Sequence, residues 1–228
     1  MNNRRIWFRL GGVLAAAAVC TGGAAVVSDR AQKAKNVQRA FLGAMETQMQ
    51  IGCYPSETGS PADLTERERT ELQTAYTSRV EQYYTEENPC RKRYIALNED
   101  FLTACDSDVE YSESGGVADC RFDSVRLYAD RMTAVVQAQT LVWDKRISGN
   151  PEQGFSVELP VNRDTITATM KKENGVWKLD SIDSQISLSA AVPADDEVCR
   201  ERYPTFETAR QAADRIDDQA YIKEARFA

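Results

Sequence analysis

The sequence contains no histidine. Histidine is the commonest general base, the commonest ligand of zinc and haem iron, and the side chain that titrates nearest to neutral pH. Its absence argues against most enzymes that use acid–base catalysis and against histidine-ligated metal centres. We therefore expect no catalytic residue, no cofactor and no metal site, and we predict that the protein is not an enzyme.

Phosphate-binding and nucleophile motifs are missing as well. There is no Gly-rich phosphate loop, no P-loop and no Gly-x-Ser-x-Gly elbow in the chain. Positive charge is in deficit, because 28 Lys and Arg stand against 35 Asp and Glu, for a formal charge of -7. A nucleic-acid backbone is repelled on average by such a surface, so nucleic acid is not an expected partner.

The N-terminal segment, residues 1–28, has the pattern of an export signal or a membrane anchor. Arg4, Arg5 and Arg9 precede an uncharged apolar run over residues 10–27. Eighteen residues of helix span about 27 Å, which is just enough to cross a bilayer core. Cleavage after Ala25 or Ser28 is the alternative. We favour an uncleaved signal anchor, because a helical pattern resumes directly after the run.

Two more specific interpretations of this segment are weaker. Cys20 follows Val19 where a lipidation site requires a small residue, so lipidation is not favoured. Arg4 and Arg5 loosely resemble a twin-arginine export signal, although an ordinary basic n-region explains them better. The Lys and Arg bias across the run does not fix its orientation, since basic residues flank it on both sides.

The cysteines favour an extracytoplasmic location. None of the five after residue 28 lies in a CxxC pair, and without histidine a structural zinc site is not expected. Disulfides are the better use of thiols in an exported chain. We predict a Cys105–Cys120 bridge closing an acidic loop over residues 106–119, worth about 3 kcal/mol. A second pair is expected from Cys53, Cys90 and Cys199; buried reduced thiols are the alternative.

Three helices are expected in the first half of the chain. Apolar residues at helical spacing predict an amphipathic helix over residues 30–51. A capping box, Thr65-Glu66-Arg67-Glu68, predicts the start of a second helix that runs to Glu87. Asn88 and Pro89 end that helix and can cap a third, which places Tyr94, Leu97 and Phe101 on one face.

The second half of the chain changes to the two-residue period of strands. Apolar residues alternate over residues 132–142, and residues 120–128 form a further expected strand. The apolar residues occupy odd-numbered positions over residues 155–161 but even-numbered positions over residues 166–170. That change predicts a register shift in residues 160–164, by a β-bulge in a bent strand or by a short hairpin turn. Asn174-Gly175 predicts a type I′ hairpin.

Helices followed by a meander of antiparallel strands indicate an α+β class. The closing hairpin, Glu173 to Ile182, is similar to the last strands of the nuclear-transport-factor-2-like (cystatin-like) fold, and the resemblance covers about residues 36–188. That resemblance implies helices packed on the concave side of a curved antiparallel sheet. Residues 191–228 then read as an acidic linker and a helical tail, for which a solvated terminal helix is favoured over a docked one.

These patterns divide the chain into three parts. Residues 1–28 are the signal anchor or signal peptide, residues 29–190 the α+β extracytoplasmic domain, and residues 191–228 the tail. The inward face of the best strand has no titratable group. The remaining candidates for chemistry are helix tyrosines, carboxylates and a short basic patch: Tyr76, Tyr83, Tyr84, Tyr94, Asp130, Glu158, Asp164, Asp180 and residues 91–93. Core packing and solvated charge are the favoured explanations of all of them.

A membrane anchor joined to such a fold, which lacks candidate residues for acid–base catalysis, predicts a non-enzymatic interaction or assembly domain. It is expected at the inner membrane, single-pass, with other envelope proteins as partners and with oligomers allowed. The arrangement resembles inner-membrane assembly components of bacterial type IV secretion and conjugation, and Mce-associated membrane proteins. The alternatives are a small-molecule-binding or isomerase-like pocket protein of the same fold, and a cleaved, secreted protein.

Overall fold

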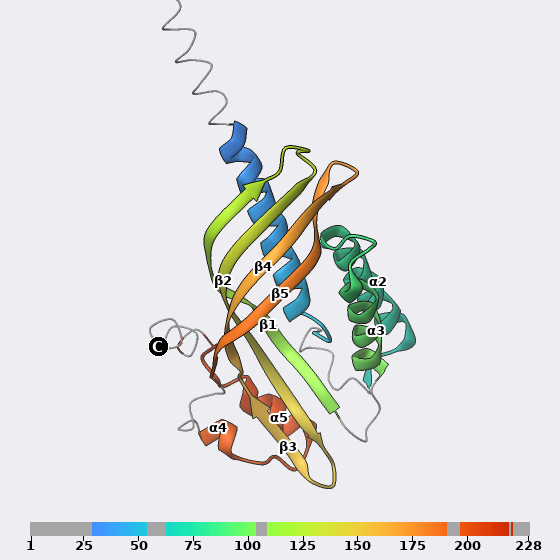
Figure 1. The fold of residues 1–228 in the computed structure, drawn as a ribbon. Helices are drawn as coiled ribbons and strands as arrows, with labels where there is room; N and C mark the ends of the chain where they lie inside the picture. The colour runs from blue at the N-terminus through green and yellow to red at the C-terminus, as the bar shows by residue number, and fades with distance from the viewer. Residues whose placement is uncertain (1–28, 54–62, 104–108, 191–196, 219, 221–228) are drawn as a thin grey trace, which may run out of the picture.

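The computed structural model describes residues 29–53, 63–103, 109–190, 197–218 and 220, which form an α+β structure (Figure 1). The helices are residues 29–49 (the first helix), α2 (Glu66–Tyr83), α3 (Pro89–Thr103), α4 (Glu197–Arg200) and α5 (Phe206–Ala213). The strands are β1 (Val109–Leu127), β2 (Thr133–Asn150), β3 (Gly154–Glu158), β4 (Val161–Glu173) and β5 (Val176–Ala190). They form one antiparallel sheet in the order β1-β2-β4-β5, and β3 also pairs with β2. The predicted α+β class is confirmed.

The first helix lies along the sheet (Figure 1). It buries one stripe of side chains against the sheet. Val37, Phe41 and Ala44 are completely buried, and Ala40 and Met45 are nearly so. Their spacing of three and four residues places them on one face of a helix. The amphipathic helix predicted from this stripe is confirmed.

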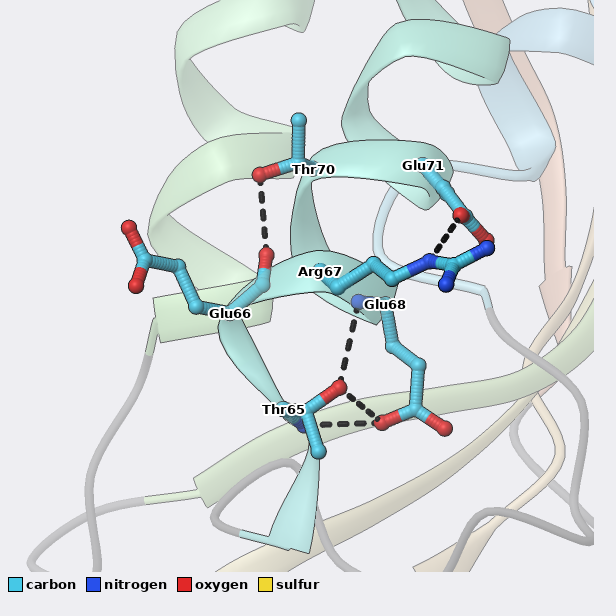
Figure 2. Close-up of polar contacts among 6 residues, drawn as sticks. All are labelled: Thr65, Glu66, Arg67, Glu68, Thr70 and Glu71. Carbon is cyan, nitrogen blue, oxygen red and sulfur yellow. Dashed lines mark hydrogen bonds and ion pairs between the residues drawn. The ribbon is translucent and has the colours of Figure 1, made fainter.

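The predicted capping box starts α2 (Figure 2). The Thr65 hydroxyl accepts a hydrogen bond from the Glu68 N–H at 3.3 Å, and the Glu68 carboxylate accepts one from the Thr65 N–H at 2.8 Å. Each side chain satisfies a backbone donor that the first turn of a helix leaves free. A further ion pair joins Arg67 to Glu71 one turn later.

The end of α2 differs from the prediction, because the helix stops at Tyr83 and not at Glu87. Tyr84 leaves the helix in an extended conformation and forms a parallel bridge with Leu179 of β5. The Thr85 N–H donates to the Leu179 carbonyl at 3.0 Å. Pairing with the sheet therefore replaces the last helical turn. This pairing is a tertiary contact, which local periodicity does not encode.

β1 is much longer than the strand predicted over residues 120–128. Residues 109–119, expected as part of an acidic loop, pair with β2 from Val109 opposite Gly149 onward. Tyr111 anchors this part of the strand, since its side chain is 1% exposed. Three register shifts each leave one extra residue in β1, which bends the strand around its partner. The loop prediction was wrong because long-range pairing outweighs a polar, Gly-containing composition.

The predicted Asn-Gly hairpin is present between β4 and β5. Asn174 and Gly175 have φ angles of 51° and 85°, and Glu173 lies opposite Val176. Both central residues of a type I′ turn require positive φ, which Asn and Gly tolerate best. The turn predicted from this dipeptide is confirmed.

Two hydrophobic cores lie on opposite faces of the same strands. The helix-side core packs the first helix, Tyr76, Val80 and Tyr84 against even-numbered strand residues: Ala134, Val136, Ala138, Val142, Ile166, Ala168 and Met170. The C-terminal core packs α5 against odd-numbered residues: Ile147, Phe155, Val157 and Leu159. Successive side chains of a strand point to opposite faces. The sheet is therefore covered on one face at one end and on the other face at the other end.

This arrangement corrects the predicted register shift in residues 160–164. Arg146 lies opposite Glu158 and Trp143 opposite Val161, so β2 keeps one register along both β3 and β4. A bulge does occur at Arg163/Asp164, but it lies on the β5 side, where β5 holds the extra residue. The buried residues switch from odd-numbered to even-numbered positions because a different element covers the sheet there, and not because the register with β2 shifts.

The tail docks on the sheet, contrary to the favoured prediction of a solvated terminal helix. Tyr203 forms an antiparallel bridge with Phe155, with N···O distances of 2.8 Å in both directions. Phe206 packs edge-on against Tyr111 and Phe155, with ring centroids 5.3 and 6.1 Å away. Residues 197–218 thus belong to the fold, and the boundary expected at residue 190 does not separate them from it.

The expected membrane anchor, residues 1–28, lies outside the described residues. Within the described ranges, no helix combines the length and the apolar character that a bilayer crossing requires.

Candidate functional site

The carboxylates singled out from the sequence do not converge on the helix tyrosines. Asp130 is exposed and accepts hydrogen bonds from the Met132 and Thr133 N–H groups at 2.9 and 3.0 Å. These bonds lower its pKa and hold the turn between β1 and β2. Glu158 is exposed on β3. Both residues are therefore structural or solvated, as the sequence analysis expected.

Asp180 and Asp164 are more enclosed. Asp180 forms an ion pair with Lys171 at 2.9 Å and accepts a hydrogen bond from the Thr85 hydroxyl at 3.1 Å. Asp164 lies opposite Thr140 on β2, and burial raises its pKa. The fully buried Thr140 hydroxyl and one Asp164 oxygen have no hydrogen-bond partner among the described residues. No described tyrosine contacts this pair through a hydrogen bond.

The helix tyrosines hold the first helix in place. The Tyr84 hydroxyl donates to the Ala44 carbonyl at 2.7 Å, and the Tyr76 hydroxyl donates to the Thr47 carbonyl at 3.2 Å. Burial raises the pKa of both phenols. Each hydroxyl is thus neutral and already bonded at physiological pH.

Tyr83 and Tyr94 complete this packing. A Cβ built on Gly43 would lie 2.2 Å from Tyr83 Cε1, so the ring sits directly on the first helix where only glycine fits. Tyr94 packs edge-on against Tyr84 at 5.6 Å between ring centroids. All four tyrosines therefore serve packing, which is the explanation that the sequence analysis favoured.

The space between the first helix and the sheet is filled by side chains. Phe41, Tyr76 and Trp177 lie in the same core cluster as Val136 and Leu179. Leu72 of α2 packs at the margin of the C-terminal core. The interior has no room for a substrate where those five residues meet.

A cleft of about 540 Å³ opens beyond this packing, between α2, the end of the first helix and β1. Its lining combines polar and apolar groups: Gln50, Cys53, Leu72, Ala75, Tyr76, Arg79, Glu113, Ser114, Gly115 and Lys145. A volume of this size suits a small organic molecule. The cleft is therefore the place to look for chemistry in the described part of the chain.

Lys145 is the most enclosed cation of the cleft. Its ammonium lies 3.1 Å from Glu113 Oε2 and 3.2 Å from Asp218 Oδ1, and the Lys145 side chain is only 8% exposed. Burial alone lowers the pKa of Lys145, but the two carboxylates outweigh it and raise the pKa above its ordinary value. Lys145 is therefore a charged structural group and not a neutral amine nucleophile.

Glu113 is the cleft carboxyl with a shifted pKa. Burial and a hydrogen bond with Asp214 raise the pKa of Glu113, while Lys145 opposes the shift. Its side chain is 7% exposed. A raised pKa moves a carboxyl toward the range that acid–base catalysis uses, which is the observation in favour of a pocket protein.

A hydrogen-bonded chain runs from Cys53, one of the residues that line the cleft. The Cys53 thiol donates to the Ser112 hydroxyl at 3.3 Å, and that hydroxyl donates to Asp144 Oδ1 at 2.5 Å. Arg146 forms an ion pair with the same carboxylate. Burial raises the pKa of Cys53 to about 11. The thiol is therefore protonated near neutral pH and is a weak nucleophile.

Disulfides are absent between the cysteines that the structure describes, Cys53, Cys90, Cys120 and Cys199. The Gly52 N–H bonds to Asn98, eight residues along α3 from Cys90, or about 12 Å of helix. A bridge requires Cα atoms within about 7 Å, so the structure does not bring Cys53 and Cys90 together. The expected second pair is thus not formed among the described residues.

Cys105 lies outside the described residues, so its bridge to Cys120 stays a prediction. Strand β1 works against that bridge. Val109 and Cys120 lie opposite Gly149 and Thr140, which are nine residues or about 30 Å of strand apart, whereas the four residues back to Cys105 span about 14 Å at most. A Cys105–Cys120 bridge therefore requires part of β1 to leave β2.

Metal binding finds no support in the described ranges, where no group of three Cys, Asp or Glu side chains is placed to hold an ion.

Lys145 and Glu113 were not identified from the sequence as residues of a site. Lys145 lies on the polar side of the alternation that predicts the strand over residues 132–142. The available signal in the sequence was the position of Asp144 and Lys145, which directly follow the apolar residues Leu141 to Trp143. Comparison with family models, with curated protein sequences and with solved structures finds no match to this chain.

Proposed function

We propose that the chain is a non-enzymatic, membrane-anchored interaction domain that works outside the cytoplasm at the inner membrane. We further propose that its fold is of the nuclear-transport-factor-2-like type. Helices packed on one face of a curved antiparallel sheet support that assignment. The additional C-terminal core, on the opposite face, is a departure from the simplest form of such a fold.

The free edge of β5 carries this proposal. β5 is the last strand of the sheet, and only Tyr84 forms a bridge to its outer side, at Leu179, among the described residues. Beyond that bridge, Ser181 and residues 183–186 are exposed, and Ile186 is 64% exposed. An unpaired strand edge is a template to which an extended segment of another protein can add as a strand.

The opposite edge of the sheet makes a contrast. β1 has three bulges along its length, and bulges are a common way to prevent strand addition at an edge. β5 has two bulges, opposite Arg163/Asp164 and Thr169/Met170, but the six residues from Ser181 to Ile186 between them pair without interruption, whereas the bulges of β1 leave runs of only four residues. A partner that pairs with the sheet is therefore expected at β5, with Ile186 as its apolar contact.

An enzymatic function of the cleft has less support than the interaction domain. Tyr76, Cys53 and Lys145 are each bonded to other protein groups. A binder of small molecules remains the second candidate, favoured by the cleft volume and by the raised pKa of Glu113. Substituting Leu72→Trp to fill the cleft should leave an interaction domain fully functional, but should abolish the function of a pocket protein.

The test of the interaction is photo-crosslinking in the natural host, with a photoreactive residue replacing Ile186. The matched control places the same residue at Arg67, whose side chain is 87% exposed on α2. We expect a discrete protein adduct from position 186 that disappears in an Ile186 probe variant carrying Gln185→Pro, and none from position 67. Adducts from neither position would contradict the proposal. Fractionation of the same cells checks the anchor separately.

A further inference from the structure

The turns of the two long hairpins, β1–β2 and β4–β5, lie at the end of the domain where the first helix starts. Figure 1 shows the β1–β2 and β4–β5 turns at this end, beside the first residues of the first helix. The Lys172 N–H donates to the Met132 carbonyl at 2.8 Å, which joins the two turns directly. We call residues 29–35, 126–132 and 171–178 the basic end.

The charge of the basic end is opposite to that of the whole chain. It contains eight Lys and Arg against three Asp and Glu, whereas the chain as a whole has a net charge of -7. Three of its cations are paired: Lys33 with Asp29, Lys178 with Glu173, and Lys171 with Asp180.

Four of the remaining five cations face solvent. Arg30, Lys35, Arg126 and Arg131 are exposed, and none of them forms an ion pair with a residue that the structure describes. Lys172 lies over the Trp177 ring at 5.8 Å. Although the protein as a whole is acidic, its unpaired positive charge is thus concentrated at the end where the first helix starts.

Exposed apolar side chains gather at the same end. Three of the four large hydrophobic residues that are exposed in the described chain belong to the two turns: Tyr128 at 56%, Met132 at 48% and Val176 at 52%. A groove of about 830 Å³ between the first helix and β1 is bordered by Arg30, Lys33, Tyr128 and Arg131. Cations interleaved with Tyr and apolar tips suit a lipid headgroup layer.

The covalent chain fixes how near this end is to the apolar run. Val27, the last residue of that run, is two residues before Asp29, and two residues span about 7 Å at most. If residues 10–27 cross the bilayer, the basic end is therefore held at its surface. The distance follows from chain connectivity and requires no knowledge of the conformation of the run.

We propose that the basic end docks on the bilayer, with its cations on anionic phospholipid headgroups and with Tyr128, Met132 and Val176 at the interface. This inference rests on the proposed membrane anchor. Docking fixes the orientation of the sheet, so that the β5 edge stands at a defined height above the membrane. Each Lys or Arg near an anionic surface contributes about a fivefold factor to the docking equilibrium.

The test uses the full chain reconstituted into nanodiscs, either half phosphatidylglycerol or entirely phosphatidylcholine, and measures hydrogen exchange of peptides covering residues 126–132 and 172–178. We expect slower exchange in the anionic discs. Arg30→Gln with Arg126→Gln should weaken docking by about 25-fold. Arg67→Gln with Arg121→Gln removes the same charge from exposed sites elsewhere and should change nothing.

The outcomes separate this inference from the anchor. A chain that does not co-elute with either disc overturns the anchor and the docking together. A chain that co-elutes but shows equal exchange in both discs overturns docking on anionic lipid alone, whether the turns are free or are held by apolar contacts. Equal loss of protection in both double variants also overturns it, since general charge and not the basic end would then be responsible.

Discussion

The helix-side core and the C-terminal core use the same strands in opposite ways. The helix-side core packs the first helix and α2 on even-numbered residues of β2 and β4. The C-terminal core packs α5 and its flanking segment on odd-numbered residues of β2 and β3, and Leu64 and Leu102 join it from the first half of the chain. A single strand, β2, passes through both. One sheet can therefore be covered on alternate faces without any change of register.

The segment of β2 between the two cores shows what this costs. Thr140, Asp144 and Lys145 are all buried there, because both faces of the strand are covered. Buried charges require partners, and Lys145 finds them in Glu113 and Asp218 while Asp144 finds Ser112 and Arg146. The buried charges of β2, Asp144 and Lys145, are thus a consequence of the change of face.

The largest expected effect comes from removing the C-terminal core's cover. A stop after Ala190 exposes Ile147, Phe155, Val157 and Leu159 to water. At about 1.5–3 kcal/mol for each side chain, the loss is roughly 6–12 kcal/mol, comparable with the whole stability of a domain. We expect no cooperative thermal transition by circular dichroism. A stop after Ala220 keeps the α5 contacts and should melt normally; a folded 190-residue chain would show that the cores are independent.

Breaking the charge cluster between the cores should have the next largest effect. Lys145→Met leaves Glu113 and Asp218 without their common cation, and removing one partner of a buried pair costs about 3–5 kcal/mol. Urea denaturation measures the loss. Adding Glu113→Gln and Asp218→Asn to Lys145→Met removes the orphaned charges and should restore most of the stability. No recovery in the triple variant would mean that packing, and not charge, was lost.

Cys53, which lines the cleft, should make stability fall at alkaline pH. Burial raises its pKa to about 11 from an ordinary value of 9.0. The unfolded thiol ionises from about pH 9 while the folded thiol keeps its proton, so stability is intact below pH 9 and declines up to pH 11. In reducing buffer, we expect this decline to be smaller for Cys53→Ser by about 2 kcal/mol at pH 10.5. Parallel curves for both proteins above pH 9 would contradict the assignment.

The smallest effect is expected at the β4–β5 turn, far from the C-terminal core. Gly175 has a φ of 85°, and a Cβ added there would meet no atom within 4 Å. Gly175→Ala therefore measures backbone strain alone, at about 1–2 kcal/mol. Thermal melting should show a correspondingly small decrease in Tm, and Ser184→Ala on exposed β5 should show none. A decrease as large as that of Lys145→Met would place the turn inside the cooperative core.

Local signals in the sequence determined several elements correctly. The stripe from Val37 to Met45, the capping box at Thr65 and the Asn174-Gly175 turn each depend on residues close in the chain. Their physics is local: helical spacing, a reciprocal side-chain bond, and tolerance of positive φ. Such features are readable before the fold is known.

Tertiary structure alone decided the rest. Residues 109–119 became strand because β2 pairs with them, and α2 ended at Tyr83 because β5 takes Tyr84. The parity change along β3 and β4 was visible in the sequence, but its cause was not. A bulge and a change of covering element produce the same alternation of apolar residues, and only the packing of α5 against Phe155 distinguishes them.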